Sequence, residues 1–328
     1  MYLISQNSIN AHVSQDTVHE FENVIFQTHE VCPVEHYSQF VYKIAYLFVR
    51  IFRKININII PSVRQRYKLK PWEDSNHLFT IMMALDEMKF RPFIITSFHN
   101  KSIYLFDAWP KDYNKIQKFC REYKINFLFV TSSKSAMSLR KLLPEINIYW
   151  LPEGIAPQFY HCEDYMNKTI DVLALGRKYD VYHLLIAERL AEKGYTYLYE
   201  HIKGQLVFPT QEEFVQGLAR TKISICVPSS VTHPERSGDV ETMTIRYLQS
   251  MVSKCLIIGH APSEMIELFG YNPVIEIDLE NSVEQLDSIL KNYSDYIPLI
   301  EKNYQLVLEH HTWQDRWNQI KEYLTINS

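Results

Sequence analysis

The sequence HPERSGDVETMTIRYLQSMVSKCLIIGHAPSEM, residues 233–265, decides the fold of this chain. Its first part, 233–240, contains proline and glycine and is predicted to be a polar loop. Apolar side chains then recur at helical spacing over 244–252, and the run 256–258 is typical of a buried strand. Because the β-branched run 223–227 precedes the loop, the stretch predicts one β-α-β unit with a polar loop in front of its helix.

The start of the predicted helix is the first candidate binding site. Glu241 and Thr242 stand at this start. The unpaired N–H groups and the positive dipole end of a helix N-terminus suit a phosphate. Glu241 and Gln249 are eight positions apart, which places them roughly two turns apart on about the same side. Glu241 would reach a ligand at the helix tip, and Gln249 a ligand lying along the helix.

Length and composition favour a two-domain intracellular protein. The 328 residues suit two domains of about 150 residues each, and 46% hydrophobic residues suffice for two cores. A net charge of −4 argues against a general nucleic-acid binder. The five cysteines are widely spaced and form no Cys-x-x-Cys, so we expect neither a zinc site nor a disulfide framework, and a cytoplasmic location fits. Neither a signal peptide nor a membrane-spanning run is expected.

Strands and helices alternate along the chain, which implies α/β domains with mainly parallel sheets covered on both faces. In the first half, the predicted strands are 23–27, 56–60, 92–97, 101–106, 126–130 and 146–149, and the predicted helices are 37–54, 77–90, 110–123 and 133–143. In the second half, the predicted strands are 170–175, 196–201, 206–208, 223–227, 256–258 and 274–277, and the predicted helices are 182–193, 211–219, 241–252, 282–292 and 297–326.

A linker and three polar loops organise these two Rossmann-like domains. Residues 151–157 contain two prolines and a glycine and are the best linker candidate. Ligands bind at the carboxyl ends of the strands in parallel sheets of this kind. Polar residues follow three predicted strands, namely Asp107, Gly176 with Arg177, and the loop 233–240. We therefore expect two domains that face a central cleft lined by these loops.

Five segments together resemble a known family. They are an acid pair motif at 241–249 with Gln249 in the second acid position, the helix end and strand 250–259, WLPEG at 150–154, LALGR at 173–177, and HTWQDR at 311–316. Through these segments, residues 170–323 resemble nucleotide-sugar-dependent glycosyltransferases with the GT-B fold. The similarity is greatest to the retaining family-4 enzymes and their spore-maturation-protein-like relatives. The family's Gly-rich loop near the first strand is missing.

The resemblance implies a division of the chain into four parts. Residues 1–152 would form a Rossmann-like domain on the acceptor side, and 153–167 the linker. Residues 168–305 would form the donor domain that binds the nucleotide sugar. The last segment, 306–328, would pack back against the first domain as a helix.

The resemblance also implies contacts with the donor. Glu241 would hold hydroxyls of the sugar and stabilise positive charge at the anomeric carbon, unless it is only a helix N-terminal acid. Arg177, together with Gly176, would bind the diphosphate, the alternative being a surface arginine. The backbone N–H groups of Thr244 and Ile245 would also bind the diphosphate, unless both residues simply pack.

Five more residues receive roles in the same way. Arg246 is a second candidate for the diphosphate or else forms a structural ion pair. Gln249 would bind the ribose hydroxyls through its amide. Glu264 would contact the nucleoside or serve as a turn residue. Asp107 would face the transferred sugar as an acid, base or hydroxyl acceptor, or would cap the helix that follows it. His99 would bind acceptor or donor, or would be a loop histidine.

The implied reaction is transfer of a sugar from a UDP- or GDP-linked donor to a glycan, a lipid-linked acceptor or a small molecule. The chain contains no Asp-x-Asp motif, so neither a metal nor another cofactor is expected. The helix 37–54 has a basic edge beside an aromatic stripe. It would contact the inner face of a membrane peripherally, or it is an ordinary core-facing helix.

Two other functions remain open. One is an enzyme of a different kind on the same fold, a sugar-nucleotide epimerase or a phosphorylase-like enzyme. The other is a non-catalytic GT-B protein that binds a sugar or a partner transferase, which the glutamine at position 249 favours.

Overall fold

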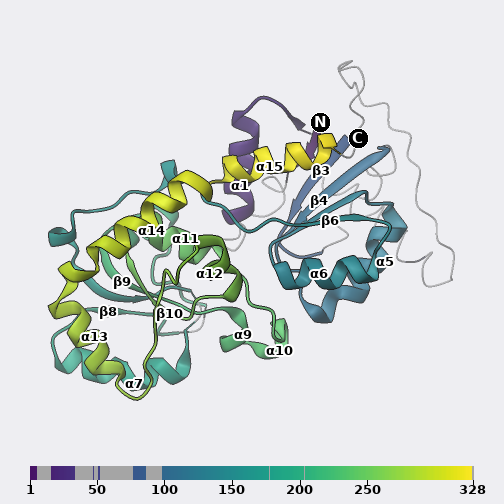
Figure 1. Cartoon of the computed structure of the whole chain (residues 1–328). Helices are drawn as coiled ribbons and strands as arrows, with labels where there is room; N and C mark the ends of the chain where they lie inside the picture. Colours follow the sequence, from purple (N-terminus) through teal and green to yellow (C-terminus); the bar gives the residue numbers. More distant parts are fainter. Residues whose placement is uncertain are drawn as a thin grey trace. The chain divides into compact units, whose positions relative to one another are not determined.

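The computed structural model describes residues 1–5, 16–33, 47, 51, 77–85, 98–176, 178–202 and 204–326. The chain forms two compact units, Met1–Leu151 and Pro152–Ser328, each built around one parallel sheet (Figure 1). The predicted strands 56–60 and 92–97 lie outside the described residues, as does nearly all of the predicted helix 37–54.

The first unit contains a six-stranded sheet with the order β2-β1-β3-β4-β5-β6, in which all neighbours are parallel. Its strands are β1 (Tyr2–Ile4), β2 (Cys32–Pro33), β3 (His77–Met82), β4 (Asn100–Leu105), β5 (Phe127–Val130) and β6 (Asn147–Trp150). Every residue of β3 and β5 is buried, as expected for a parallel sheet covered on both faces.

Two helices of the first unit confirm the sequence prediction. Pro110–Asp112 forms a short 3-10 turn, and α5 (Tyr113–Tyr123) follows it. The helix α6 (Ser133–Leu142) begins after Ser132, whose hydroxyl caps it by accepting a hydrogen bond from the N–H of Ser135. Apolar residues of both helices join the core that covers the sheet, so this face is closed.

Two predictions for the first unit were wrong. Residues 23–27 were predicted to form a strand but belong to the helix α1 (Asp16–Gln27), which buries Val18, Phe21 and Ile25. Residues 77–90 were predicted to form a helix, but His77–Met82 is the central strand β3. Both segments contain a short apolar run, and periodicity alone does not distinguish a buried strand from a buried helix in such runs.

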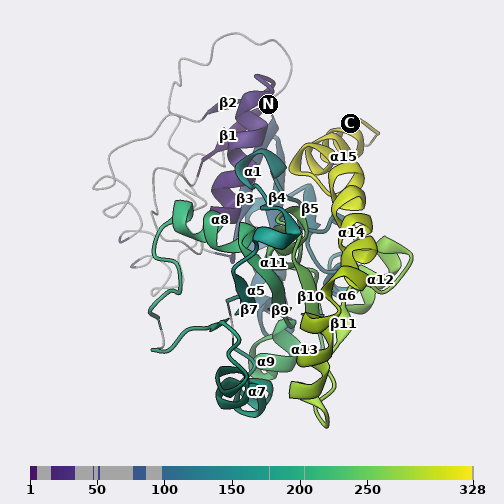
Figure 2. The ribbon, with the colours of Figure 1, turned by 90° about the vertical axis from the view of Figure 1, so that its left-hand side faces the viewer.

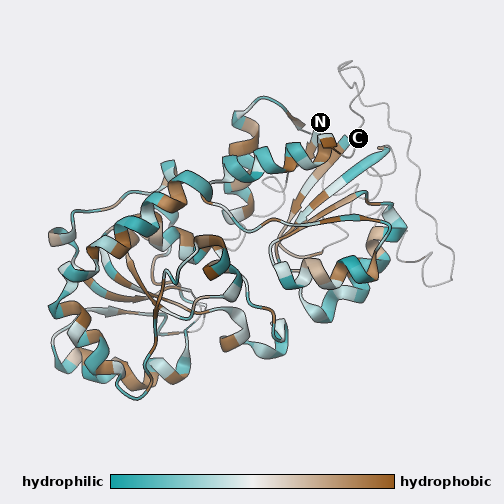
Figure 3. Ribbon diagram, in the orientation of Figure 1, coloured by the Kyte–Doolittle hydropathy of each residue, from teal (hydrophilic) through white to brown (hydrophobic). Residues whose placement is uncertain are grey.

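The second unit contains a five-stranded parallel sheet with the order β11-β10-β9-β7-β8. Its strands are β7 (Ile170–Ala174), β8 (Tyr197–Leu198), β9 (Thr221–Cys226), β10 (Leu256–Gly259) and β11 (Ile275–Glu276). The predicted strand 206–208 is wrong, because these residues are irregular. Hydrophobic residues fill β5 and predominate in β7 and β10, whereas β4 and β6 begin with hydrophilic residues, and the helices carry hydrophilic outer faces (Figure 3).

The second unit also contains nine α-helices among its described residues. They are α7 (Asp180–Glu192), α8 (Gln211–Ala219), α9 (Ser229–Thr232), α10 (Pro234–Ser237), α11 (Ile245–Val252), α12 (Ser263–Phe269), α13 (Ser282–Lys291), α14 (Ile297–His310) and α15 (Trp313–Ile326). The segment 233–240 was predicted to lack regular structure, but it contains α10. Helix α14 lies alongside α11, and α13 alongside α7 (Figure 2).

The linker motif and the tail motif meet within the second unit. Ile155 pairs with Thr312, and the guanidinium of Arg316 donates hydrogen bonds to the carbonyls of Pro152 (2.8 Å) and Glu153 (3.3 Å). The segment around Glu153 is thereby fixed to the start of α15. The predicted domain limits, and the predicted packing of 306–328 against the first domain, stay predictions.

Candidate functional site

The carboxyl edge of the second sheet gathers the candidate donor residues. The chain leaves β7 toward β8 on one side and returns to β9 on the other side of β7. The strand order therefore reverses between β7 and β9, and the crevice at such a switch point is where open α/β sheets bind their ligands. Leu175 and Gly176 follow β7, Val227 follows β9, and His260 follows β10.

Arg246 lies across this switch point. Its Nη1 donates to the carbonyl of Leu175 (3.0 Å), and its Nη2 lies 3.5 Å from the carbonyl oxygen of Val227. Gly176 packs against the side chain of Arg246, since a Cβ added at Gly176 would be 2.8 Å from Cδ of Arg246. Gly176 also has a φ of +76°, which favours glycine. The structure therefore brings Gly176 and Arg246 together and places a permanent positive charge where the strand order reverses.

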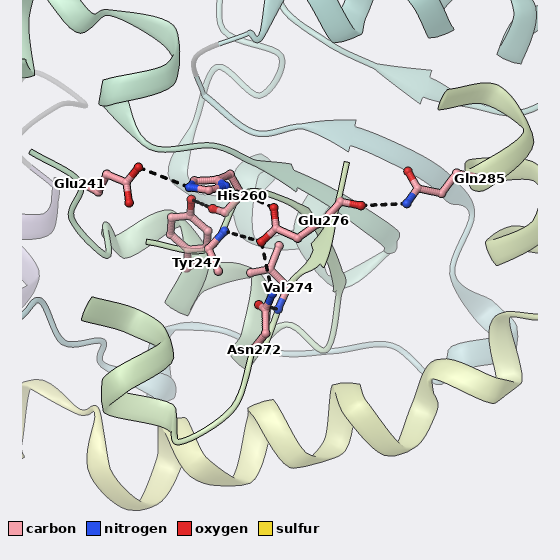
Figure 4. Close-up of polar contacts among 8 residues, drawn as sticks. Glu241, Tyr247, His260, Asn272, Val274, Glu276 and Gln285 are labelled. Atoms are coloured by element: carbon pink, nitrogen blue, oxygen red, sulfur yellow. Dashed lines mark hydrogen bonds and ion pairs between the residues drawn. The ribbon is translucent and has the colours of Figure 1, made fainter. Parts of the chain in front are cut away.

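A second polar group lies at the ends of β10 and β11 (Figure 4). His260 Nε2 is 3.3 Å from Oε1 of Glu241, and His260 Nδ1 is 3.2 Å from Oε2 of Glu276. The hydroxyl of Tyr247 donates to the carbonyl of His260 at 2.7 Å. All these side chains are partly exposed except the fully buried Tyr247, so the carboxylates border solvent.

The N-terminus of α11 differs from the expectation. The helix begins at Ile245 rather than near Glu241, with Thr244 as its N-cap. The N–H of Ile245 donates to Oε2 of Glu153 at 2.7 Å, and this carboxylate is almost fully buried. A protein carboxylate thus already satisfies the first-turn N–H that was predicted to bind a diphosphate.

Thr244 is an unusual N-cap. Its side chain makes no capping hydrogen bond, although threonine normally caps through its hydroxyl. Within the described part of the chain its buried Oγ1 has no hydrogen-bond partner. The same holds for the buried hydroxyls of Ser229, Ser230 and Thr232 on α9, the helix that follows β9. Hydroxyl groups on two segments near the carboxyl edge therefore retain their hydrogen-bonding capacity.

Gln249 and Glu264 both make internal contacts. The amide of Gln249 donates to the hydroxyl of Tyr160 at 3.0 Å. Glu264 lies in the first turn of α12, is buried, and accepts a hydrogen bond from the N–H of Met243 at 3.1 Å. Glu264 therefore fixes the segment between Glu241 and α11.

The two candidates of the first unit lie at opposite ends of one strand. Asp107 follows the carboxyl end of β4, is partly buried, and donates its N–H to the carbonyl of Met83 at 2.7 Å. His99 is exposed and precedes the amino end of β4. The six residues of β4 span roughly 20 Å. The structure therefore does not bring His99 and Asp107 together. The predicted contact Arg177 lies outside the described residues.

Beneath Arg246, the thiol of Cys226 ends β9 between Ser224 and Ser250. Its sulfur lies 3.6 Å from the hydroxyl of Ser224 and 3.7 Å from that of Ser250. Burial raises the pKa of the Cys226 thiol, so this side chain packs rather than acts as a nucleophile. The described residues contain no group of three or more histidine, cysteine or acidic side chains placed to hold a metal.

Four residues with contacts at the site were not predicted from the sequence, namely His260, Glu276, Glu153 and Tyr160. One signal was available for His260, because it directly follows the predicted strand 256–258 and its glycine. The other three depend on contacts between distant segments.

None of the helices described in the structure is long and apolar enough to cross a membrane.

No protein-family model matches the sequence. A comparison with curated proteins gives no match either. Solved structures do match, at very low identity. A glycosyltransferase from Rickettsia africae has a TM-score of 0.55 and 11% identity, covering 98% of this chain and 96% of that one. Sucrose-phosphate synthase from Thermosynechococcus elongatus has a TM-score of 0.58 and 11% identity, covering 100% and 99%.

A third match is Anabaena HepE in complex with UDP-glucose, with a TM-score of 0.59 and 8% identity, covering 99% of this chain and 98% of that one. Together with two parallel α/β units, these similarities confirm the predicted fold class. The chain has the GT-B fold. At such identities the similarity concerns the fold alone.

Proposed function

We propose that this protein is a glycosyltransferase that moves a sugar from a nucleotide diphosphate sugar to an acceptor. One observation carries the proposal. The carboxyl edge of the second sheet presents the Arg246 guanidinium over β7 and β9, and the Glu241 carboxylate beside His260, which follows β10. A cation that would suit a diphosphate and an acid that would suit a sugar are thus held at the ends of neighbouring strands.

The spacing of the strands supports the assignment of Arg246 to the diphosphate and Glu241 to the sugar. Adjacent strands lie about 4.8 Å apart, so the end of β10 is one or two strand spacings from the switch point between β7 and β9. A diphosphate bound at Arg246 would place its sugar near Glu241. Two N–H groups of Arg246 bind carbonyls, and the rest of its fork can donate to phosphate oxygens.

The proposed chemistry uses fixed charges. The acceptor oxygen would bond to the anomeric carbon as the bond from that carbon to the diphosphate breaks, and the acceptor proton would pass to an oxygen of the leaving diphosphate. Negative charge then grows on the leaving group and positive charge on the sugar. Arg246 would stabilise the first and Glu241 the second, as preorganised electrostatics. We further propose that Arg177 adds to the diphosphate contacts, that no metal is needed and that the anomeric configuration is retained. The resemblance of the sequence to retaining family-4 enzymes supports these three points.

We also propose a chemical class for the donor and for the acceptor. Because HepE has been solved with UDP-glucose, a UDP-linked donor is the first to try, with a GDP-linked donor as the alternative. The acceptor would be a glycan, a lipid-linked molecule or a small molecule. Asp107 would face the transferred sugar, and His99 would contact the donor or the acceptor at a different position. Leu47 and Ile51 are both exposed, which supports a peripheral membrane contact through 37–54.

The test is sugar transfer from radiolabelled UDP-glucose, UDP-N-acetylglucosamine and GDP-mannose to a panel of acceptors. We expect Glu241→Ala and Arg246→Ala to lower transfer at least about tenfold, which corresponds to one lost contact of about 1.4 kcal/mol. Exposed Glu309 provides the control variant Glu309→Ala, which should retain full activity. Near-normal rates in both site variants, with folding intact, would refute this site.

A non-catalytic binding protein is the second candidate. Gln249 replaces the expected second acid, and its amide is bound to Tyr160. Binding of a sugar nucleotide without transfer to any acceptor would favour this candidate. Formation of an epimer from the labelled donor without an acceptor would instead identify an epimerase.

A further inference from the structure

His260 uses both of its ring nitrogens. Nε2 lies 3.3 Å from the carboxylate of Glu241, and Nδ1 lies 3.2 Å from the carboxylate of Glu276 (Figure 4). A neutral imidazole donates from one nitrogen, whereas an imidazolium donates from both. One ring therefore links two acids that come from different segments of the second unit.

The backbone of His260 is fixed from two sides. Its N–H donates to the carbonyl of Cys226 at 3.1 Å, and its carbonyl accepts the hydroxyl of the buried Tyr247 at 2.7 Å. The preceding Gly259 lies so close to β9 that an added Cβ would be 1.7 Å from the carbonyl oxygen of Cys226. The position of the imidazole is therefore set by the sheet and by α11.

Glu276 is anchored as well. Its Oε1 accepts hydrogen bonds from the N–H of Ala261 (3.3 Å) and from the amide of Asn272 (3.2 Å). Its backbone carbonyl accepts the amide of Gln285 on α13 at 2.8 Å. These contacts hold Glu276 in place, so it forms a fixed end of the row of three side chains made by Glu276, His260 and Glu241.

Glu241 lies at the other end of the row. It lies outside any helix or strand, in the segment before α11. Among the described residues, the one polar contact of its carboxylate is with His260. An acid on an irregular segment would otherwise sample several rotamers. The imidazole therefore selects one orientation of this carboxylate and leaves its second oxygen able to accept a sugar hydroxyl.

We propose that His260 is a positioning residue for the donor sugar, which holds the carboxylate of Glu241 in place while Glu276 anchors the ring. This inference rests on the proposed function, because Glu241 is the acid assigned to the sugar. It predicts that His260 affects binding of the sugar and not of the nucleoside diphosphate.

The experiment compares calorimetric titrations with UDP-glucose and with UDP, which lacks the sugar. If UDP-glucose does not bind the wild-type protein, UDP-N-acetylglucosamine with UDP and GDP-mannose with GDP replace this pair. We expect His260→Ala to weaken binding of the sugar nucleotide about tenfold and to leave binding of the diphosphate within about twofold, since the contact that orients Glu241 is lost. His260→Gln, which keeps an amide donor, should recover part of the loss.

His310→Gln is the matched control, because His310 is an exposed histidine beside an acid, Glu309, in the same unit. It should bind both ligands as the wild type does. Unchanged sugar-nucleotide binding in His260→Ala would overturn the proposal. Equal losses for the sugar nucleotide and the diphosphate would also overturn it, because a merely structural role predicts that result.

The ring itself gives a readout that needs no ligand. The ¹⁵N signals of His260 should move at Nε2 in Glu241→Gln and at Nδ1 in Glu276→Gln. Absence of both shifts would show that the ring does not hold Glu241. If no sugar nucleotide binds the wild-type protein, the proposed function fails together with the donor role of this row, while the ring signals still decide the positioning contact.

Discussion

Replacing Glu153 with alanine should loosen the helix at the centre of the proposed donor site. Oε2 of Glu153 accepts the N–H of Ile245, the first residue of α11, at 2.7 Å, and the side chain of Glu153 is nearly fully buried. A hydrogen bond to a charged group contributes about 1.5–3 kcal/mol, and the negative charge at a helix N-terminus adds about 0.5 kcal/mol. We expect a local loss of about 2–3 kcal/mol in Glu153→Ala and about 1 kcal/mol in Glu153→Gln, which keeps an acceptor.

Native-state hydrogen exchange measures this effect directly. A loss of about 2.7 kcal/mol lowers the protection of the Ile245 amide about 100-fold. The control is Glu213→Ala, which removes the acid from the capping box of α8 and should loosen α8 without changing α11. Unchanged protection of Ile245 in Glu153→Ala would show that the carboxylate does not hold the helix, and the reasoning would be refuted.

Three further predictions concern the second unit. Burial and the nearby Arg316 lower the pKa of His311 to about 3, whereas in the unfolded chain this histidine binds a proton below about pH 6.5. The free energy of unfolding should therefore fall as the pH drops below about 6.5, by about 2 kcal/mol at pH 5. Urea titrations of His311→Gln at several pH values should lack this contribution to the pH dependence of stability. Gly259→Ala should prevent stable folding in thermal unfolding assays, because the Cβ would be 1.7 Å from a carbonyl oxygen, whereas Gly270→Ala, which meets nothing within 4 Å, should cost about 1 kcal/mol from its φ of +72°; similar melting temperatures for the two variants would contradict this. Arg246→Lys should weaken UDP binding about tenfold in calorimetry, because an ammonium cannot reproduce the planar guanidinium that contacts two carbonyls and would also donate to a phosphate. Equal affinities of the variant and the wild type would contradict the proposed phosphate contact of Arg246.

Much of the second unit follows from local sequence patterns. The two strands that flank 233–252 and the helix between them were predicted correctly, although α10 interrupts the predicted loop, and α8 occupies the residues expected for it. These elements have long periodic or β-branched patterns, which are reliable signals. The exchanged assignments at 23–27 and 77–82 arose in short apolar runs, where a buried strand and a buried helix have the same composition.

The details of the candidate site were harder to predict because they depend on distant contacts. The helix start was placed at Glu241, but the chain stays irregular until Ile245, where Glu153 meets the first N–H. Glu153 is 92 positions away, and no local pattern marks it as a capping acid. His260 pairs with Glu241 only because β10 and the segment before α11 end at the same edge of the sheet. Sequence motifs thus predicted which edge of the sheet carries the site, but not which residues pair there.

The most direct test of the central claim is a residue-resolved NMR titration of the wild-type protein with UDP-glucose, UDP-N-acetylglucosamine and GDP-mannose. If the carboxyl edge of the second sheet binds a nucleotide diphosphate sugar, at least one donor should shift the signals of Gly176, Glu241, Arg246 and His260. The matching nucleoside diphosphate should shift Gly176 and Arg246 and leave Glu241 and His260 unchanged. Absence of shifts at these residues with every donor would contradict the account.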